Sequence, residues 1–343
     1  MKRFSIALLF ASSLLYSQNS TKASEKIEEG IRLYNAGRYS DAIDKYNEAL
    51  HIDKDNYVAL AEKAMTLDIL GKYDDAIEIC QHILKLYSRS DNSGIYVTYG
   101  NALDHAGKPG LALQIYDEGI RKNPDSYHLY FNKGITLANQ EDIQGARKEF
   151  QKATLLYPNH SSSYYALAIV EEKNRIPSIL AACRYLTLDN KTRRATETLF
   201  LILDQLKKER SQEADTIADK NVIEQLEKER KSSFTAIDLA LSSRIVSQNL
   251  TKFTASESER LKEMLEVVFS SLAQELSKEK KNSNDYYWVF LAPYFVKMYQ
   301  QKYVEVFANI ALATKNNREA LHYIQKNSEK VDAFYKWSED YWK

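Results

Sequence analysis

The sequence predicts an all-α protein, in which an array of stacked helical hairpins is followed by further helices. Two observations lead to this fold class. A short segment recurs through the N-terminal half at nearly constant spacing, and all ten glycines lie between Gly30 and Gly145. The chain after Gly145 therefore lacks the residue that tight turns between strands use most. The composition of the 343 residues, 44% hydrophobic and 27% charged, is typical of a folded protein with one or two domains.

The first 17 residues are predicted to be a secretory signal peptide. Two basic residues start the chain, a mostly apolar run follows from Phe4 to Tyr16, and Ser17 is a small residue at the expected cleavage point. The run is shorter than the about 20 residues that span a bilayer. An uncleaved anchor or a buried helix is the alternative interpretation. We expect residues 1–17 to be removed, the protein to be exported, and no transmembrane span to remain.

The recurring segment begins at Gly37, Gly71 and Gly107, and a fourth copy without glycine begins at Glu141. Successive copies are 34, 36 and 34 residues apart. A period near 34 is typical of a helix–turn–helix repeat. The copies define four repeats, at 23–56, 57–90, 93–126 and 127–160. Small residues recur in the first helix at Gly30, Ala64, Gly100 and Gly134, and alanines recur in the second helix at Ala42, Ala76, Ala112 and Ala146.

These positions resemble the tetratricopeptide repeat, and repeat four carries most of its pattern: Tyr130, Gly134, Leu137, Ala146, Phe150, Ala153 and Pro158. The resemblance implies an α-solenoid, a right-handed superhelix of helical hairpins. Small residues let the two helices of a hairpin approach closely. A large residue four positions after the alanine fills the remaining gap, as Tyr46, Cys80, Tyr116 and Phe150. Glycine at the turns is expected to take the left-handed conformation that ends the first helix.

A fifth, degenerate repeat is predicted at 161–190, which extends the array over 23–190. Tyr164, Leu167 and Ala168 match a first helix, but Leu180 stands where the alanine is usual. Residues 191–231 are predicted to form a capping helix and a charged helical linker.

Residues 232–343 are predicted to form a C-terminal helical domain in which we recognise no family motif. Ser256 and Glu259 have the spacing of a capping box at the start of a helix that reaches about Leu276. Eight aromatic residues crowd the segment 285–303, where Pro293 should kink or restart the helix. We expect these rings to be core, and the alternative is a contact surface for a partner or glycan. The tail from Trp337 to Trp342 is expected to dock on the same domain.

The chain carries no recognisable catalytic, metal-binding or cofactor motif, so we expect a protein that is not an enzyme and needs no cofactor. A formal net charge of zero argues against nucleic acid as a partner. The two cysteines, Cys80 and Cys183, lie several hairpins apart, so we expect them to stay unpaired.

The resemblance places a partner in the concave face of the array, which is lined mainly by first helices. The predicted groove residues are Tyr34, Asn35, Met65, Asp68, Asn101, Asp104, His105, Phe131, Asn132, Asn139 and Tyr165. Asn side chains both donate to and accept from a peptide backbone. The face lacks the paired Lys and Arg of repeats that clamp a terminal carboxylate, so we expect a weakly acidic, mixed groove.

These features favour an exported scaffold or adaptor that binds a protein or peptide segment, in the periplasm or at the outer surface of a Gram-negative bacterium. The alternative is an envelope-processing enzyme, or a subunit of an envelope complex, whose active or interface surface lies in the C-terminal helical half.

Overall fold

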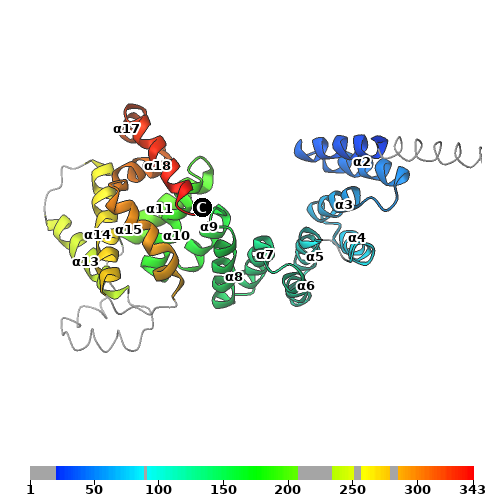
Figure 1. The fold of residues 1–343 in the computed structure, drawn as a ribbon, viewed down its shortest axis with the longest axis horizontal. Coiled ribbons are helices and arrows are strands. Elements are labelled where there is room, and N and C mark those ends of the chain that lie inside the picture. Colours follow the sequence, from blue (N-terminus) through cyan, green and yellow to red (C-terminus); the bar gives the residue numbers. More distant parts are fainter. Residues whose placement is uncertain (1–20, 89–90, 208–233, 251–255, 279–284) are drawn as a thin grey trace, which may run out of the picture. The chain divides into compact units, whose positions relative to one another are not determined.

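The computed structural model describes residues 21–88, 91–207, 234–250, 256–278 and 285–343 (Figure 1). Within these ranges every regular element is a helix, which confirms the all-α class. The chain divides into two compact units between Leu156 and Tyr157, and each is described by itself. The predicted signal peptide and most of the charged linker lie outside the described residues, and the predicted domain boundaries stay predictions.

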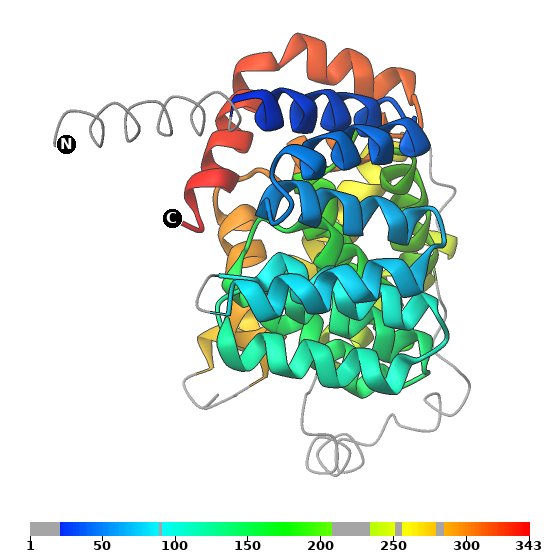
Figure 2. The same cartoon turned by 90° about the vertical axis from the view of Figure 1, so that its right-hand side faces the viewer.

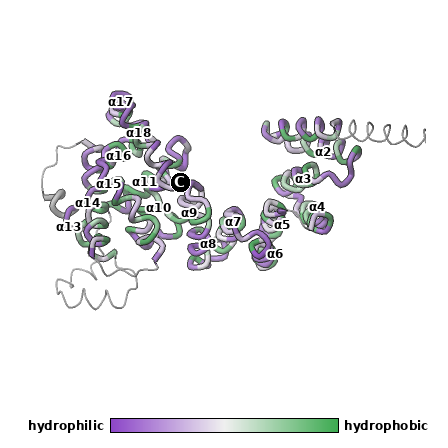
Figure 3. Tube along the Cα trace, in the orientation of Figure 1, coloured by the Kyte–Doolittle hydropathy of each residue, from purple (hydrophilic) through white to green (hydrophobic). Residues whose placement is uncertain are grey.

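The first unit is a run of antiparallel helices in which each helix packs on the next (Figure 2). The helices are residues 21–35, α2 (Tyr39–Ile52), α3 (Tyr57–Ile69), α4 (Tyr73–Leu86), α5 (Ser93–His105), α6 (Pro109–Lys122), α7 (Tyr127–Asn139) and α8 (Ile143–Leu156). Each helix carries both apolar and polar residues along its length (Figure 3), as expected for helices with one buried face.

The turn between the two helices of each hairpin has the same backbone geometry in all four repeats. Gly37, Gly71 and Gly107 have φ of 75°, 75° and 73°, which confirms the left-handed conformation predicted for them. Glu141 occupies the fourth turn with φ of 62°, a region that disfavours a residue with a side chain. Each turn residue donates its N–H to the carbonyl three residues before it, and the next residue donates to a carbonyl five residues back. This Schellman-type bonding satisfies the last carbonyls of the first helix.

The two helices of a hairpin fit because a small residue faces a large one. A Cβ atom on the first-helix glycine would come within 2.4 Å of the Tyr46 ring at Gly30, 2.3 Å of the Tyr116 ring at Gly100 and 2.6 Å of the Phe150 ring at Gly134. Repeat two has Ala64 instead of glycine, and the facing position is the small Cys80. A larger first-helix residue is therefore paired with a smaller facing residue, so that the two helices fit without a clash.

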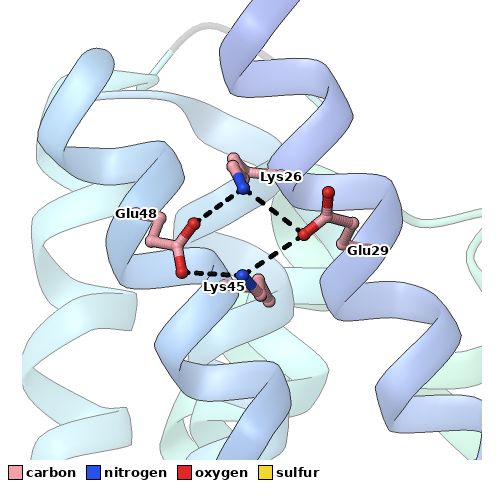
Figure 4. Close-up of polar contacts among 4 residues, drawn as sticks. All are labelled: Lys26, Glu29, Lys45 and Glu48. Carbon is pink, nitrogen blue, oxygen red and sulfur yellow. Dashed lines mark hydrogen bonds and ion pairs between the residues drawn. The ribbon is translucent and has the colours of Figure 1, made fainter.

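The first hairpin also carries a network of four partly exposed charged residues (Figure 4). Lys26 and Glu29 belong to the helix at residues 21–35, and Lys45 and Glu48 belong to α2. Lys26 Nζ lies 2.9 Å from Glu48, and Lys45 Nζ lies 3.3 Å from Glu29 and 2.8 Å from Glu48. The network joins the two helices on their solvent side.

The second unit is a helical bundle around α10. Its helices are α9 (Ser161–Val170), α10 (Arg175–Leu188), α11 (Arg193–Lys207), α13 (Thr235–Leu250), α14 (Glu257–Ser277), the π-helix η2 (Tyr287–Leu291), α15 (Ala292–Gln300), α16 (Val304–Ala313), α17 (Arg318–Lys326) and α18 (Ser328–Asp340). Every residue of α10 from Ile176 to Thr187 is buried. This helix contacts α9, α11, α13, η2 and α16, so the core of the unit lies around it.

Several local predictions for this unit are confirmed. Ser256 and Glu259 form the capping box at the start of α14. The helix restarts at Pro293, which lies in the first turn of α15 directly after the π-helix. The tail docks within the unit, because Trp342 lies 4.5 Å from Phe290 and 5.6 Å from Tyr294 between ring centroids. Both cysteines are free and buried, as expected.

The hairpin of α15 and α16 repeats the turn geometry of the first unit, which sequence reasoning missed. Lys302 has φ of 59°, and its N–H and that of Tyr303 bond to carbonyls at the same offsets as in the glycine turns. The residue sizes are reversed here. At the positions equivalent to the glycine and the second-helix alanine stand Phe295 and Phe307, both buried. The small-residue pattern of the four repeats is therefore absent here, although the turn is kept.

No helix within the described ranges is both long and apolar enough to cross a membrane.

Candidate partner-binding site

The first helices of the hairpins lie closer together than the second helices. In the first unit α3 packs on α5, and α5 packs on α7, in addition to the contacts between consecutive helices. The second helices α4, α6 and α8 have no comparably extensive contacts with one another. An array whose first helices crowd together curves toward them, so α3, α5 and α7 line the inner face.

Four of the eleven predicted groove residues meet on this inner face. His105 Nδ1 at the end of α5 lies 2.8 Å from Asp68 Oδ1 on α3. Asp104 accepts a hydrogen bond of 2.9 Å from Thr136 on α7. Asn101 Oδ1 accepts one of 2.6 Å from the Tyr116 hydroxyl on α6. We call Asp68, Asn101, Asp104 and His105, with Tyr116 and Thr136, the inner polar cluster.

Sequence reasoning missed Tyr116 and Thr136 as members of this cluster. Tyr116 was assigned only a packing role, and its ring does pack on Gly100. Its hydroxyl nevertheless reaches the inner face. The phenol itself was a usable signal, since most buried tyrosine hydroxyls have a hydrogen-bond partner.

The inner polar cluster is acidic. The Asp68 side chain is only 10% exposed and Asp104 is half-buried. Neither carboxylate forms an ion pair with Lys or Arg among the described residues. Burial raises the pKa of the Tyr116 phenol, and the charges of Asp104 and Asp68 raise it further. Burial and the charge of Asp68 likewise raise the pKa of the Cys80 thiol to about 12. Both effects show negative charge acting on buried neighbours.

A third carboxylate lies on α3 before Asp68. Glu62 is half-buried, and burial raises the pKa of its carboxyl group. Burial is the main cause that raises the pKa of the half-buried Tyr34. The charges of Tyr39 and then of Glu62 raise it further. The Tyr34 ring packs edge-on against Tyr39 with centroids 5.4 Å apart. Glu62 was not among the predicted groove residues.

The other predicted groove residues do not join the cluster through any hydrogen bond. Asn132 donates 2.8 Å to the carbonyl of His128 in its own helix, and Phe131 packs 5.8 Å from Phe150. Met65 is half-buried, and Asn35 and Asn139 are exposed. Tyr165 lies in the second unit, where its ring contacts Tyr185 at 5.5 Å and the Arg194 guanidinium at 5.4 Å. The assignment of these residues to a groove stays a prediction.

A shallow depression of about 580 Å³ adjoins the inner polar cluster at His105. Its walls are the turn after α3 and the turn after α5, with lining residues Gly71, Lys72, Tyr73, Asp74, Asp75, His105, Ala106 and Lys108. The Tyr73 ring lies 5.7 Å from the His105 ring, and Lys108 Nζ lies 3.5 Å from Asp74. The depression offers rings and both signs of charge next to the cluster.

In the part of the chain that the structure describes, no group of three or more His, Cys, Asp or Glu side chains is arranged to hold a metal ion.

Comparison with known proteins gives matches in the repeat region. Residues 33–92 and 99–175 match two family models, each described as tetratricopeptide repeat. The small glutamine-rich tetratricopeptide repeat-containing protein of Dictyostelium discoideum is 30% identical over 125 residues, or 36% of this chain and 35% of that protein. TPR repeat-containing protein MJ1428 of Methanocaldococcus jannaschii is 22% identical over 139 residues, or 40% of this chain and 24% of that protein.

Among solved structures, the thermophilic TPR protein TTC0263 of Thermus thermophilus aligns with 53% of this chain and 99% of its own, at 20% identity and a TM-score of 0.47. The matches span well under half the length of these two curated relatives. The small-to-large residue pairs, the shared turns and the two model matches coincide in one region. Residues 33–92 and 99–175 of this chain are therefore tetratricopeptide repeats.

Proposed function

We propose that this protein is a non-catalytic interaction scaffold that binds a basic peptide or protein segment on the inner face of α3, α5 and α7. The observation that carries the proposal is the inner polar cluster, in which Asp68 and Asp104 have no Lys or Arg partner among the described residues. Carboxylates held in a partly desolvated face favour a partner that supplies Lys or Arg side chains.

The remaining inner-face residues suit such a segment. Glu62 extends the acidic character along α3, and the half-buried Met65 and Phe131 supply apolar contacts beside it. The rings of Tyr34 and Tyr73 offer faces over which a cationic group can lie. A partner with alternating basic and apolar residues therefore matches this face better than one that presents a carboxylate.

The test replaces both cluster carboxylates by their isosteric amides, Asp68→Asn with Asp104→Asn. Asn101 is a poorer choice for substitution, because its loss would leave the buried Tyr116 hydroxyl without its acceptor. Partners are recovered from the native host with the purified protein as bait, and the affinity of each is then measured by calorimetry. We expect the double variant to bind at least about tenfold more weakly, since each desolvated charge contact contributes on the order of 1.4 kcal/mol or more.

The matched control changes the same charge on a second helix, with Asp41→Asn and Asp44→Asn in α2. Partner recovery should be as in the wild type for this control. Equal affinity of the wild type and the Asp68 and Asp104 variant would rule out the inner polar cluster as the binding surface.

We also propose that the protein is exported to the periplasm or outer surface of a Gram-negative bacterium, where it could join an envelope complex. The basic start and the apolar run before Ser17 support this proposal. Fractionation of cells that express the tagged protein, followed by N-terminal sequencing, tests it. A cytoplasmic protein that retains Met1 would contradict it.

A further inference from the structure

Arg184 is a fully buried cation in the second unit, at a position that is otherwise packed by tyrosine, cysteine or phenylalanine. It follows Leu180 by four residues, as Tyr46, Cys80, Tyr116 and Phe150 follow the alanines of repeats one to four. Burying a charge is costly unless it is paired, and an apolar residue would fill the slot without that cost. Arg184 departs from the residue types that fill this position in the other repeats, and such departures are often found at functional sites.

The contacts of Arg184 are all with neutral groups. Nη1 donates to hydroxyls of Thr187 (2.9 Å), Ser338 (3.2 Å) and Tyr294 (3.4 Å), and Nη2 donates to the Pro158 carbonyl (3.2 Å) and Asn159 Oδ1 (2.9 Å). The guanidinium carbon lies 4.9, 5.4 and 5.7 Å from the ring centroids of Tyr294, Trp342 and Tyr164. Ring faces attract a cation, but they do not neutralise it. No carboxylate pairs with Arg184 within the described ranges.

Three hydrogen-bonding groups around Arg184 are buried without a partner among the described residues. They are Arg184 Nε, Trp342 Nε1 and the Tyr164 hydroxyl, which lies beside Arg184 and Tyr286 but forms no hydrogen bond of normal geometry with them. All three can donate, and a buried donor without an acceptor destabilises a folded protein. Three such donors around one guanidinium therefore need an explanation.

We propose that Arg184, Tyr164 and Trp342 form a binding site for a carboxylate, which enters when the Trp342 side chain moves aside. A carboxylate has one negative charge, which matches the single cation of the site. A phosphate carries about −1.5 to −2 near pH 7 and would leave excess charge buried. Trp342 follows the last turn of α18 and is partly exposed, so it can open with less loss of packing than the fully buried Tyr164 or Tyr294. The surrounding rings favour a carboxylate with an apolar neighbour.

The experiment measures the melting temperature of the intact protein in sodium acetate, sodium phosphate and sodium chloride at equal ionic strength. We expect acetate to raise it by roughly 3 °C or more above chloride near saturation, because a ligand stabilises the state that binds it. Arg184→Met should remove the increment, and the variant should fold because it exchanges a buried charge for an apolar side chain of similar length. Tyr164→Phe keeps its ring, Trp342→Phe keeps a smaller aromatic ring, and each loses one donor, so each should reduce the increment.

Arg194→Met is the matched control, because Arg194 is an exposed arginine over a tyrosine ring in the same unit. It should respond to acetate as the wild type does. An acetate increment that is equal in the wild type, Arg184→Met and both donor variants would overturn the proposal, and so would a larger increment with phosphate than with acetate. If Arg184→Met does not fold, the two donor variants decide the outcome.

The source of the carboxylate is identified by following the tryptophan fluorescence while a short alanine peptide is added, either as the free acid or as the amide. A response to the free acid but not the amide identifies a chain terminus, and a response to acetate alone identifies a small acid. If neither the free-acid peptide nor acetate changes the fluorescence, the site is overturned. The Asp68 and Asp104 variant should keep its acetate response, so the test stands apart from that of the inner polar cluster.

Discussion

The two units solve the same packing problem in different ways. In the first unit, the two facing residues of a hairpin are matched in size, with tyrosine opposite glycine at Tyr116 and Gly100 and the smaller cysteine opposite alanine at Cys80 and Ala64. In the second unit, α10 is buried on all sides and places Arg184 where the array places a ring or a thiol. The first unit keeps charge at its surface and inner face, whereas the second has a cation at its centre.

The difference shows which part of a repeat carries its fold and which part is free to change. The turn geometry survives in both units, because it depends only on the backbone and on one residue that tolerates positive φ. The pattern of small and large residues is kept only where a hairpin stacks on another hairpin of the same kind. When a hairpin packs against different helices instead, as α15 and α16 do, large residues can replace small ones.

The largest effect is expected from breaking the size pairing, with Gly100→Ala in α5. Its Cβ would lie 2.3 Å from the Tyr116 ring, so the ring or the helix must shift. We expect a loss of about 2 kcal/mol in the opening free energy of α5 and α6, measured by native-state hydrogen exchange. The usual gain of about 1 kcal/mol for alanine over glycine in a helix does not offset such a clash.

Gly94→Ala in the same helix is the control, because a Cβ there meets no other group within 4 Å. This variant should leave protection in α5 unchanged or raise it. Equal protection in both variants would show that the pairing of Gly100 with Tyr116 does not limit the approach of the helices.

The repeat fold could be predicted because its information is local. Gly37, Gly71 and Gly107 each specify a turn, and Gly30 with Tyr46 specifies a helix contact inside one frame. The inner polar cluster was predicted only in part, because the bond from Thr136 to Asp104 joins two repeats at positions where the family pattern imposes no residue.

Arg184 was missed for a different reason. Its neighbours Tyr294 and Ser338 come from α15 and α18, more than 100 residues further along the chain. No periodicity links them to α10, so only the tertiary structure brings them to the guanidinium. The turn at Lys302 was missed because the glycine and alanine that mark such turns are both replaced.

A smaller effect is expected from restoring glycine at the turns that lack it, with Glu141→Gly in the first unit and Lys302→Gly in the second. Both residues have positive φ, which costs roughly 1–2 kcal/mol for a residue with a side chain. Glycine removes this strain but loses more entropy on folding, so we expect a net gain of about 0.5–1 kcal/mol for each variant. Hydrogen exchange of the adjoining helices provides the measurement.

Gln140→Gly and Gln301→Gly, one residue earlier in each turn, are the controls. Both positions have negative φ, so glycine brings only its entropic cost and should destabilise the turns. A gain at Glu141 without one at Lys302 would mean that the second unit does not use its turn as the first unit does.

The smallest effect concerns the surface charges of the first hairpin, which should respond to acid where the contacts of Arg184 do not. Hydrogen bonding to Lys45 is the main cause that lowers the pKa of both Glu29 and Glu48. A lowered folded-state pKa contributes stability that is present above the ordinary Glu value of 4.5 and is lost as the pH falls through the folded value. The variant Glu29→Gln with Glu48→Gln should thus be less protected than the wild type near pH 7, and the difference should vanish in acid.

Salt should shrink the difference between this variant and the wild type as well, because the charged groups of the network are partly exposed to solvent. The hydroxyl, amide and carbonyl acceptors of Arg184 do not titrate in this range, so exchange in α10 should show no matching change between wild type and variant. A difference that persists below pH 3 would show that the network acts through packing and not through charge.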